Sequence, residues 1–370
     1  MEISKGLIVS IRRVGHGDLD GHNIVDLSDC TLIPGLVDSH VHLSMSGSDD
    51  QEMRRHQLNA SFNDAQGLIA NHLNEHIAQG VVALRDGGDH AGHTLRYRKE
   101  MLPNRKSPAI LRTAGRAWHA HGRYGGIIGR SALRGQSLAQ AILNSPDDVD
   151  HVKIVNSGIN SLDIFGKETP PQFDLEQLRK AVQAGQDLGL KTMVHANGKL
   201  AVKTAIEAGC HSIEHGYFMG NENMVSMSEK RITWVPTLSP MDAYSRILRS
   251  GSPESETAKK NLDHQIYQTY RAAQYGVNIA TGTDSGSPGV YHGHAIKEEI
   301  RLLISAGIST ETAIQCATSN GARLLGLENE IGRLTPGMPA TFIVIRTPPG
   351  GLIDALNYPG AVCVRGGRVG

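Results

Sequence analysis

Two histidines, His40 and His42, stand two residues apart at the end of the apolar stretch 34–42. Side chains two apart on an extended strand point to the same face, so these residues offer two imidazoles on one side. Such a pair can supply two ligands to one metal ion. Two histidines that donate to backbone carbonyls would give the same pattern, so the pair alone leaves both interpretations open.

Further polar residues lie in or just after later apolar runs. They are Lys153 within 151–155, His195 after 192–194, His215 after 212–214 and Asp284 after 279–283. A lysine inside a buried strand needs a partner, because an unpaired buried charge is costly. Each residue taken alone fits a hydrogen-bonded core position. Their recurrence at five strand ends favours one shared site, since barrel enzymes keep catalytic groups at the carboxyl ends of strands.

Eight β-branched runs alternate with segments of helical periodicity. The runs are 35–40, 81–86, 109–113, 152–155, 191–195, 212–215, 233–236 and 278–284. In 175–188 apolar residues recur every three or four positions, with Asp174 as a candidate N-cap and Gly189 after the last turn. The alternation predicts parallel strands joined by helices. Eight units favour an α/β fold of the (β/α)8 TIM-barrel type over an open doubly wound sheet, and no G-x-G-x-x-G motif follows an early strand.

The two ends of the chain consist of short apolar runs broken by glycine and proline. We expect residues 1–33 and 331–370 to form one small β-sandwich subdomain, and residues 34–330 to form the (β/α)8 barrel. No apolar stretch is long enough for a signal peptide or a transmembrane helix, so we expect a cytoplasmic protein.

Composition restricts the kind of partner. Lysine plus arginine and aspartate plus glutamate each total 37, so the formal net charge is zero, and aromatic residues make up 4%. This balance excludes the basic, aromatic surface typical of nucleic-acid binding and gives no reason to expect a membrane partner. A small-molecule substrate is expected, and a homo-oligomer stays open. The four cysteines are scattered without a C-x-x-C pair, which is typical of a reducing compartment.

His40-x-His42, Lys153, His195, His215 and Asp284, in this order, resemble the metal-site residues of the amidohydrolase superfamily. The similarity runs from about residue 32 to 344. The segments 212–216, 282–284, 317–322 and 331–337 are similar to the prolidase-like (Xaa-Pro dipeptidase-like) subgroup. Lys153 matches the lysine of the binuclear branch, which single-metal members do not use in this way.

This resemblance implies two divalent metal ions, with zinc as the expected metal. His40, His42 and Asp284 would hold one ion, and His195 and His215 the other. Lys153 would bridge them as a carbamate formed with carbon dioxide. A metal-bridging hydroxide would then attack an amide carbonyl, while Asp284 takes up its proton and passes it to the leaving amine.

The loop after the third strand carries candidate substrate residues. His121 resembles the histidine that polarises the carbonyl, with His119 as the alternative because Ala120 stands where a glycine is usual. Arg123 and Tyr124 could bind a substrate carboxylate, or could belong to a solvated loop. Tyr217 could face the substrate or serve packing alone.

The expected function is hydrolysis of the amide bond of a dipeptide or an N-acyl amino acid. The same site could instead hydrolyse a cyclic amide, a lactone or a carbamate. A catalytically silent metal-binding barrel is the alternative of another class. All six site residues are present, which favours an active enzyme.

Overall fold

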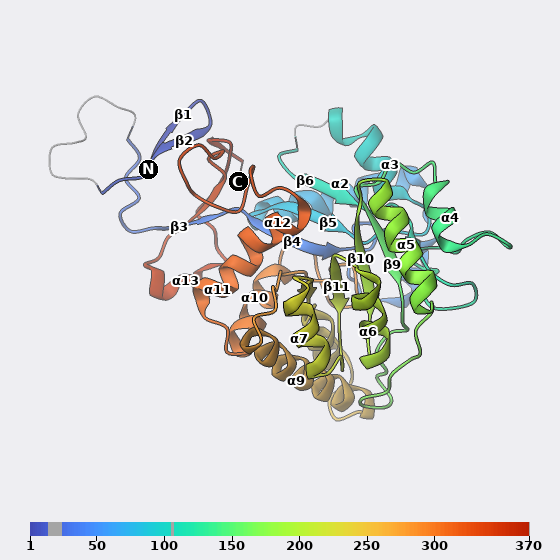
Figure 1. Cartoon of the computed structure of the whole chain (residues 1–370). Coiled ribbons are helices and arrows are strands. Elements are labelled where there is room, and N and C mark those ends of the chain that lie inside the picture. The colour runs from blue at the N-terminus through green and yellow to red at the C-terminus, as the bar shows by residue number, and fades with distance from the viewer. Residues whose placement is uncertain (14–23, 105–106, 370) are drawn as a thin grey trace.

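Parallel strands form a barrel at the centre of the computed structural model, which describes residues 1–13, 24–104 and 107–369 (Figure 1). The barrel strands are β4 (Leu36–Val41), β5 (Val81–Asp86), β6 (Ile110–Thr113), β7 (Ala117–Trp118), β9 (His151–Val155), β10 (Lys191–Ala196), β11 (Ser212–His215) and β12 (Thr233–Val235). β7 continues β6 past a bend and pairs with β9 and with the short β8 (Gly129–Arg130). The pairings between these strands are parallel, so their carboxyl ends meet at one mouth.

The segment 278–285 closes the barrel without forming a regular strand. Trp234 N donates to Asn278 O at 2.8 Å on one side, and Asp284 N donates to His40 O at 2.7 Å on the other. Isolated parallel bridges connect the segment to the same two neighbours. The backbone leaves the extended conformation at Asp284, whose φ is 57°. The prediction of a TIM barrel is therefore confirmed, with an irregular eighth strand.

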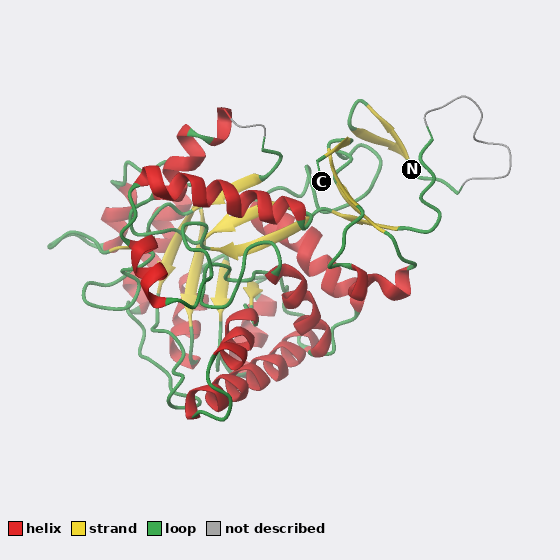
Figure 2. Ribbon diagram, turned by 180° about the vertical axis from the view of Figure 1, so that it is seen from behind, coloured by secondary structure: helices red, strands yellow, loops and turns green. Residues whose placement is uncertain are grey.

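Helices surround the barrel on its outer face (Figures 1 and 2). They are α1 (Gln51–Leu58), α2 (Phe62–Ala78), α3 (His93–Glu100), α4 (Leu138–Leu143), α5 (Leu175–Asp187), α6 (Lys199–Ala208), α7 (Asn221–Glu229), α8 (Ser239–Ile247), α9 (Pro253–Gln274), α10 (Ala295–Ser305), α11 (Thr310–Gln315), a π-helix (Cys316–Asn320) and α12 (Gly321–Leu325), with a 3-10 turn at Leu102–Asn104. Within the described part of the chain, no helix is long and apolar enough to cross a membrane.

Helix α5 shows how the sequence sets these elements. The Asp174 carboxylate accepts a hydrogen bond from Gln177 N at 2.8 Å, and the Gln177 side chain bonds back to the Asp174 backbone. This capping box satisfies amide groups that the first turn leaves free. Leu178, Ala181 and Val182 are buried on one face, at the spacing that a helix packed against a sheet requires.

A small β-subdomain joins the two ends of the chain (Figure 1). Its antiparallel sheet has the order β15 (Gly367–Arg368), β14 (Ala361–Val364), β13 (Phe342–Ile345) and β3 (Thr31–Pro34). The hairpin of β1 (Glu2–Ser4) and β2 (Leu7–Ser10) places Ile8 in one apolar cluster with Phe342 and Val344. The predicted β-subdomain from both termini is thus confirmed, whereas its boundaries at 33/34 and 330/331 stay a prediction. The segment 331–370 also holds a 3-10 turn (Pro349–Gly351) and the short α13 (Leu352–Ala355), which the apolar pattern did not predict.

The barrel strands are buried on both faces, and this burial decides the chemistry of their polar residues. All six residues of β4 are buried, and so are all five of β9. Apolar side chains such as Leu36 and Ile154 fill most of these positions. A buried charged or hydrogen-bonding group is costly without partners, so His40 and Lys153 must find theirs inside the barrel.

Candidate active site

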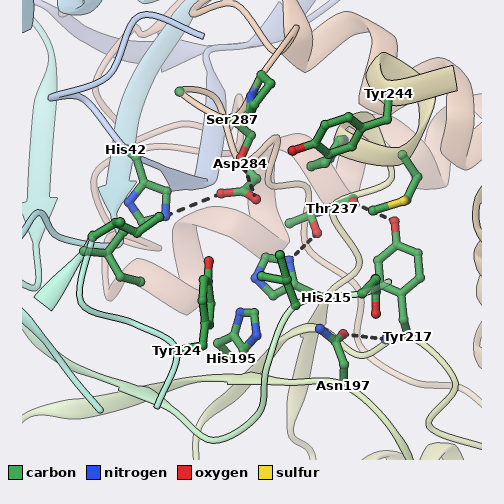
Figure 3. Close-up of a pocket in the computed structure, with 18 of the residues that line it drawn as sticks. His42, Tyr124, His195, Asn197, His215, Tyr217, Thr237, Tyr244, Asp284 and Ser287 are labelled. Atoms are coloured by element: carbon green, nitrogen blue, oxygen red, sulfur yellow. Dashed lines mark hydrogen bonds and ion pairs between the residues drawn. The ribbon is translucent and has the colours of Figure 1, made fainter. Parts of the chain in front are cut away.

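Six polar side chains meet at the carboxyl mouth of the barrel: His40, His42, Lys153, His195, His215 and Asp284. Nε2 of His40 lies 3.5 Å from Oδ1 of Asp284, and Nε2 of His42 lies 3.4 Å from the same oxygen (Figure 3). One ligand atom from each of these three residues lies within 4.8 Å of the others. Nitrogen and carboxylate ligands at this spacing can hold a divalent metal ion.

Lys153 lies in the middle of β9, close to His40 of β4. Its side chain is buried, and its Nζ lies 3.4 Å from Nε2 of His40. Burial lowers the pKa of Lys153 to about 8, although the carboxylates of Glu214 and Asp284 oppose this effect. About a tenth of the amine is therefore neutral at pH 7, and the neutral amine is the form that reacts with carbon dioxide.

His195 and His215 lie at the carboxyl ends of the neighbouring strands β10 and β11. Their ring centroids lie 4.5 Å apart, and the His215 ring lies 5.0 Å from that of His40. Burial lowers the pKa of His195 to about 3 and that of His42 to about 4. Burial also holds the pKa of His215 well below its usual value. These imidazoles are neutral at pH 7, as metal ligands must be.

Backbone carbonyls fix two of the rings. His42 Nδ1 donates to Gly88 O at 2.9 Å, and His195 Nε2 donates to Gly158 O at 3.1 Å. A neutral imidazole carries one N–H, so the second nitrogen of each ring keeps its lone pair. That lone pair is available to a metal ion, and the carbonyl fixes which nitrogen offers it.

Glu214 fixes the orientation of the His40 ring through a hydrogen bond to Nδ1. Its Oε2 accepts a hydrogen bond from His40 Nδ1 at 2.9 Å, which leaves the lone pair on Nε2, the nitrogen near Asp284. The other oxygen of Glu214 accepts bonds from Arg85 at 2.9 Å and from Ser212 at 2.5 Å. Glu214 and Arg85 are both buried, so the guanidinium compensates a carboxylate that would otherwise be costly here.

Two site residues have a backbone conformation that side chains with a Cβ rarely adopt. The φ angles of His215 and Asp284 are 67° and 57°. Thr237, whose Oγ1 lies 2.7 Å from His215 Nδ1, is β-branched and has a φ of 46°. Such conformations cost free energy and concentrate at functional sites, where the surroundings impose them. Here they turn the ends of two strands so that the side chains face one cavity (Figure 3).

The carboxyl group of Asp284 is suited to proton transfer. Burial raises the pKa of Asp284 to about 7, while the nearby Lys153 opposes this effect. Oδ2 of Asp284 accepts a hydrogen bond from Ser287 Oγ at 3.1 Å, which orients the group. A side chain with a pKa near 7 can both accept and release a proton at neutral pH.

A cavity of about 710 Å³ opens above the six side chains. This volume suits a small-molecule ligand. Its wall includes three tyrosines, Tyr124, Tyr217 and Tyr244, together with Asn197 and Arg54. Residues 159–163, in the loop that follows β9, also line it.

Of the predicted substrate residues, two line the cavity. Tyr124 lies beside His195, with ring centroids 5.6 Å apart. Tyr217 is buried, and its hydroxyl donates to Thr237 O at 3.3 Å. Burial raises the pKa of both phenols, so both hydroxyls are protonated and can donate hydrogen bonds.

For His119, His121 and Arg123 the expected roles toward the substrate stay a prediction. The cavity wall formed by the described residues does not include them. Arg123 N donates to Ala120 O at 3.0 Å and closes a turn that leaves His121 exposed. His119 Nδ1 bonds Ala120 O at 2.9 Å, and the Arg123 guanidinium donates to Pro170 O at 3.2 Å on the surface.

Sequence reasoning missed three residues of the site. Glu214 lies inside the strand run 212–214, and a charged residue inside a buried strand is the same signal that indicates a role for Lys153. Arg54 and Tyr244 lie on helices α1 and α8, far from any strand end. Nothing in their local sequence distinguishes them from ordinary helix residues, because the fold alone brings them to the cavity.

The chain belongs to the amidohydrolase family, whose family model matches residues 31–362. The fold and the site described above agree with this membership. The protein is therefore an enzyme, a hydrolase that acts on amide-type bonds, and the predicted resemblance is confirmed.

Several individual proteins are similar to this chain in sequence or in structure. Ochratoxinase from Aspergillus niger is 27% identical over 371 residues, which cover 90% of this chain and 73% of that protein. Imidazolonepropionase from Streptomyces griseus is 26% identical and covers 88% of this chain and 80% of that protein. A crystal structure of a Xaa-Pro dipeptidase with methionine bound in its active site superposes with a TM-score of 0.84 at 26% identity. That superposition covers 99% of this chain and 93% of the dipeptidase.

Proposed function

We propose that this enzyme uses two metal ions to hydrolyse the amide bond of a dipeptide or an N-acyl amino acid. The observation that carries the proposal is the convergence of four neutral imidazoles and a carboxylate around the buried Lys153. A single metal ion would not need a lysine at that position. The Xaa-Pro dipeptidase that resembles this chain holds an amino acid in its active site, which supports an amino-acid product.

The residues of the site would divide between the two ions. His40, His42 and Asp284 would hold one ion, and His195 and His215 the other. The neutral amine of Lys153 would add to carbon dioxide and release one proton, which leaves a carbamate anion. Its two oxygens could then serve both ions, and zinc is the metal we expect.

The chemistry divides between the metal ions and the protein. Two bound divalent ions supply an acidified water and an electrophile for the scissile carbonyl. Asp284 accepts the proton of the attacking water and passes it to the leaving nitrogen, as its pKa of about 7 permits. Tyr124, which lines the cavity on the same loop as His121, donates its hydroxyl proton in a hydrogen bond to the carbonyl oxygen.

Metal analysis and a substrate panel test this proposal. The purified enzyme should bind about two metal ions per chain, lose activity on chelation and regain it with zinc. Lys153→Met should bind markedly less metal, whereas Lys167→Met, which changes an exposed lysine of the same cavity, should keep full occupancy. A Lys153→Met enzyme with full metal content and full rate would contradict the carbamate bridge.

A second candidate function is hydrolysis of a cyclic amide at the same site. It is favoured by the similarity to imidazolonepropionase, which extends over 88% of this chain. Lactones and carbamates would use the same polarised carbonyl. A panel of dipeptides and N-acyl amino acids that shows no turnover, with full metal occupancy, would shift the assignment to these substrates.

A further inference from the structure

Arg54 is a half-buried cation in the wall of the substrate cavity. It lies on α1, the helix that follows β4, and it lines the same cavity as Asp284. Burial lowers the pKa of Arg54, because water is partly excluded from its guanidinium. An arginine placed in this way has either an anionic partner in the protein or one that arrives with a ligand.

The loop after β4 holds this guanidinium in place. Nη1 of Arg54 donates to Ser48 O at 3.1 Å and to Gly286 O at 2.9 Å. Gly286 follows Asp284 by two residues, so the cation is tied to the segment that carries the catalytic carboxyl. Gly289 N also donates to Gly47 O at 2.7 Å, which joins the same two loops a second time.

No carboxylate of the described residues forms an ion pair with Arg54, and both of its hydrogen bonds use Nη1. Nε and Nη2 therefore remain free of protein acceptors within the part of the chain that the structure describes. These two nitrogens form one edge of the guanidinium, which matches the two oxygens of a carboxylate. The buried Arg85 differs, because Glu214 already occupies it at 2.9 Å.

Neutral hydrogen-bond donors accompany this cation. Tyr244, Asp284 and Tyr124 lie close enough to Arg54 to interact with it electrostatically, although Asp284 forms no ion pair with it, and burial raises the pKa of both phenols. Figure 3 shows both hydroxyls directed toward the part of the cavity that holds Asp284. Because the Tyr124 proton is assigned to the scissile carbonyl, Tyr244 is the hydroxyl that can join Arg54 in binding an anion.

We infer that Arg54 binds the free carboxylate of the amino acid that leaves when the amide bond is cleaved. This inference rests on the proposed function. In an N-acyl amino acid, the carboxylate is attached to the same carbon as the leaving nitrogen. A group that binds the carboxylate must then lie near the group that protonates the nitrogen, as the link from Arg54 through Gly286 to Asp284 provides. Arg54 thereby selects substrates with a free carboxyl end.

Paired substrates test this selection. We would measure acetate release from N-acetyl-L-methionine and from N-acetyl-L-methioninamide, which differ only in the negative charge of the carboxyl end. Arg54→Met should lower kcat/KM for the acid about 10- to 100-fold, mainly through KM, and leave the amide unchanged. Arg54→Lys should recover part of the loss. Arg55→Met is the matched control, because Arg55 is the exposed neighbour on the same helix, and it should change neither substrate.

Equal losses on both substrates, or no loss on either, would overturn the inference. Calorimetric titration of the metal-loaded enzyme with L-methionine separates this result from the proposed function, since binding needs no turnover. Arg54→Met should weaken that binding by a similar factor. Binding that depends on Arg54 in an enzyme without amidase activity would refute the proposed function alone. If Arg54→Met turns over the acid as fast as the wild type does, or if the wild-type enzyme binds no methionine, the inference alone is refuted.

Discussion

The carboxylate of Glu214 lies 2.9 Å from Nδ1 of His40, on the side of the ring opposite to Asp284. Glu214 is fully buried and cannot touch a substrate, whereas His40 is a predicted metal ligand. Carboxylates in this position set the tautomer of the ligand and raise its basicity. Glu214 thus acts on the metal through His40.

Glu214→Gln is expected to weaken metal binding about 10- to 100-fold. The change should also destabilise the fold by about 3–5 kcal/mol, because Arg85 is left as an unpaired buried charge. Competition with a metal-binding dye gives the affinity, and urea unfolding gives the stability. The double variant Glu214→Gln/Arg85→Met should recover stability without recovering affinity. Recovery of both would mean that Glu214 acts on the fold alone.

Metal uptake by Lys153 should depend on carbon dioxide and on pH. The pKa of Lys153 is lowered to about 8, so the neutral amine increases as pH rises through that value. At a fixed pressure of carbon dioxide, zinc uptake by metal-free enzyme should quicken about tenfold from pH 7 to pH 9. Uptake at the same rate in solutions freed of carbon dioxide would contradict the carbamate.

Tyr124 and His121 can be compared directly, since they lie on the same loop. Tyr124→Phe should lower kcat about 100-fold, because a hydrogen-bond donor to the developing oxyanion is lost. His121→Ala should leave kcat and KM unchanged, because His121 is exposed outside the cavity wall. Metal content should stay the same in both variants. A large loss of kcat in His121→Ala would instead support His121 as the residue that polarises the carbonyl.

His72 should make stability depend on pH. This buried ring donates from Nδ1 to Leu43 O at 2.9 Å and stacks on His292, with centroids 3.9 Å apart. Burial lowers its pKa from 6.5 to about 4. The unfolded chain therefore binds more protons between these values, so the stabilisation is present above pH 6.5 and is lost as pH falls toward 4.

Urea unfolding of metal-free protein at pH 7 and pH 5 measures this effect. The free energy of unfolding should fall by roughly 2 kcal/mol less in His72→Phe than in the wild type. Phenylalanine keeps the stacked ring. Protonated His72 also lowers the pKa of His76 and of His292, so the loss of this repulsion acts in the same direction as the loss of His72 itself. Identical pH dependence in the two proteins would show that His72 protonates as easily in the folded state as in the unfolded chain.

The sequence predicted those parts of the site that depend on strand ends. His40, His195 and His215 follow apolar runs whose period and length identify strands, and parallel strands bring their ends together whatever the loops do. The eighth run was placed correctly but is irregular, because Asp284 adopts a positive φ that no local pattern announces.

The substrate residues were harder to predict, for a physical reason. The conformation of the loop that holds His121 and Tyr124 depends on contacts such as that of Ala120 N with Gln172 Oε1 at 2.9 Å, 52 residues away. Arg54 reaches the cavity through bonds to Gly286, which is 232 residues distant. Distant contacts of this kind leave no periodic signal in the sequence.

A single residue connects the antiparallel sheet of the β-subdomain to the barrel. β3 ends at Pro34 and β4 begins at Leu36, while a side chain on the intervening Gly35 would come within 2.6 Å of Val82. A force applied to this sheet would therefore be transmitted to His40 through Gly35, the single residue between β3 and β4. Attaching the enzyme to a solid support through β14 or β15 should therefore impair it more than attachment at the exposed Leu133, which lies outside this sheet.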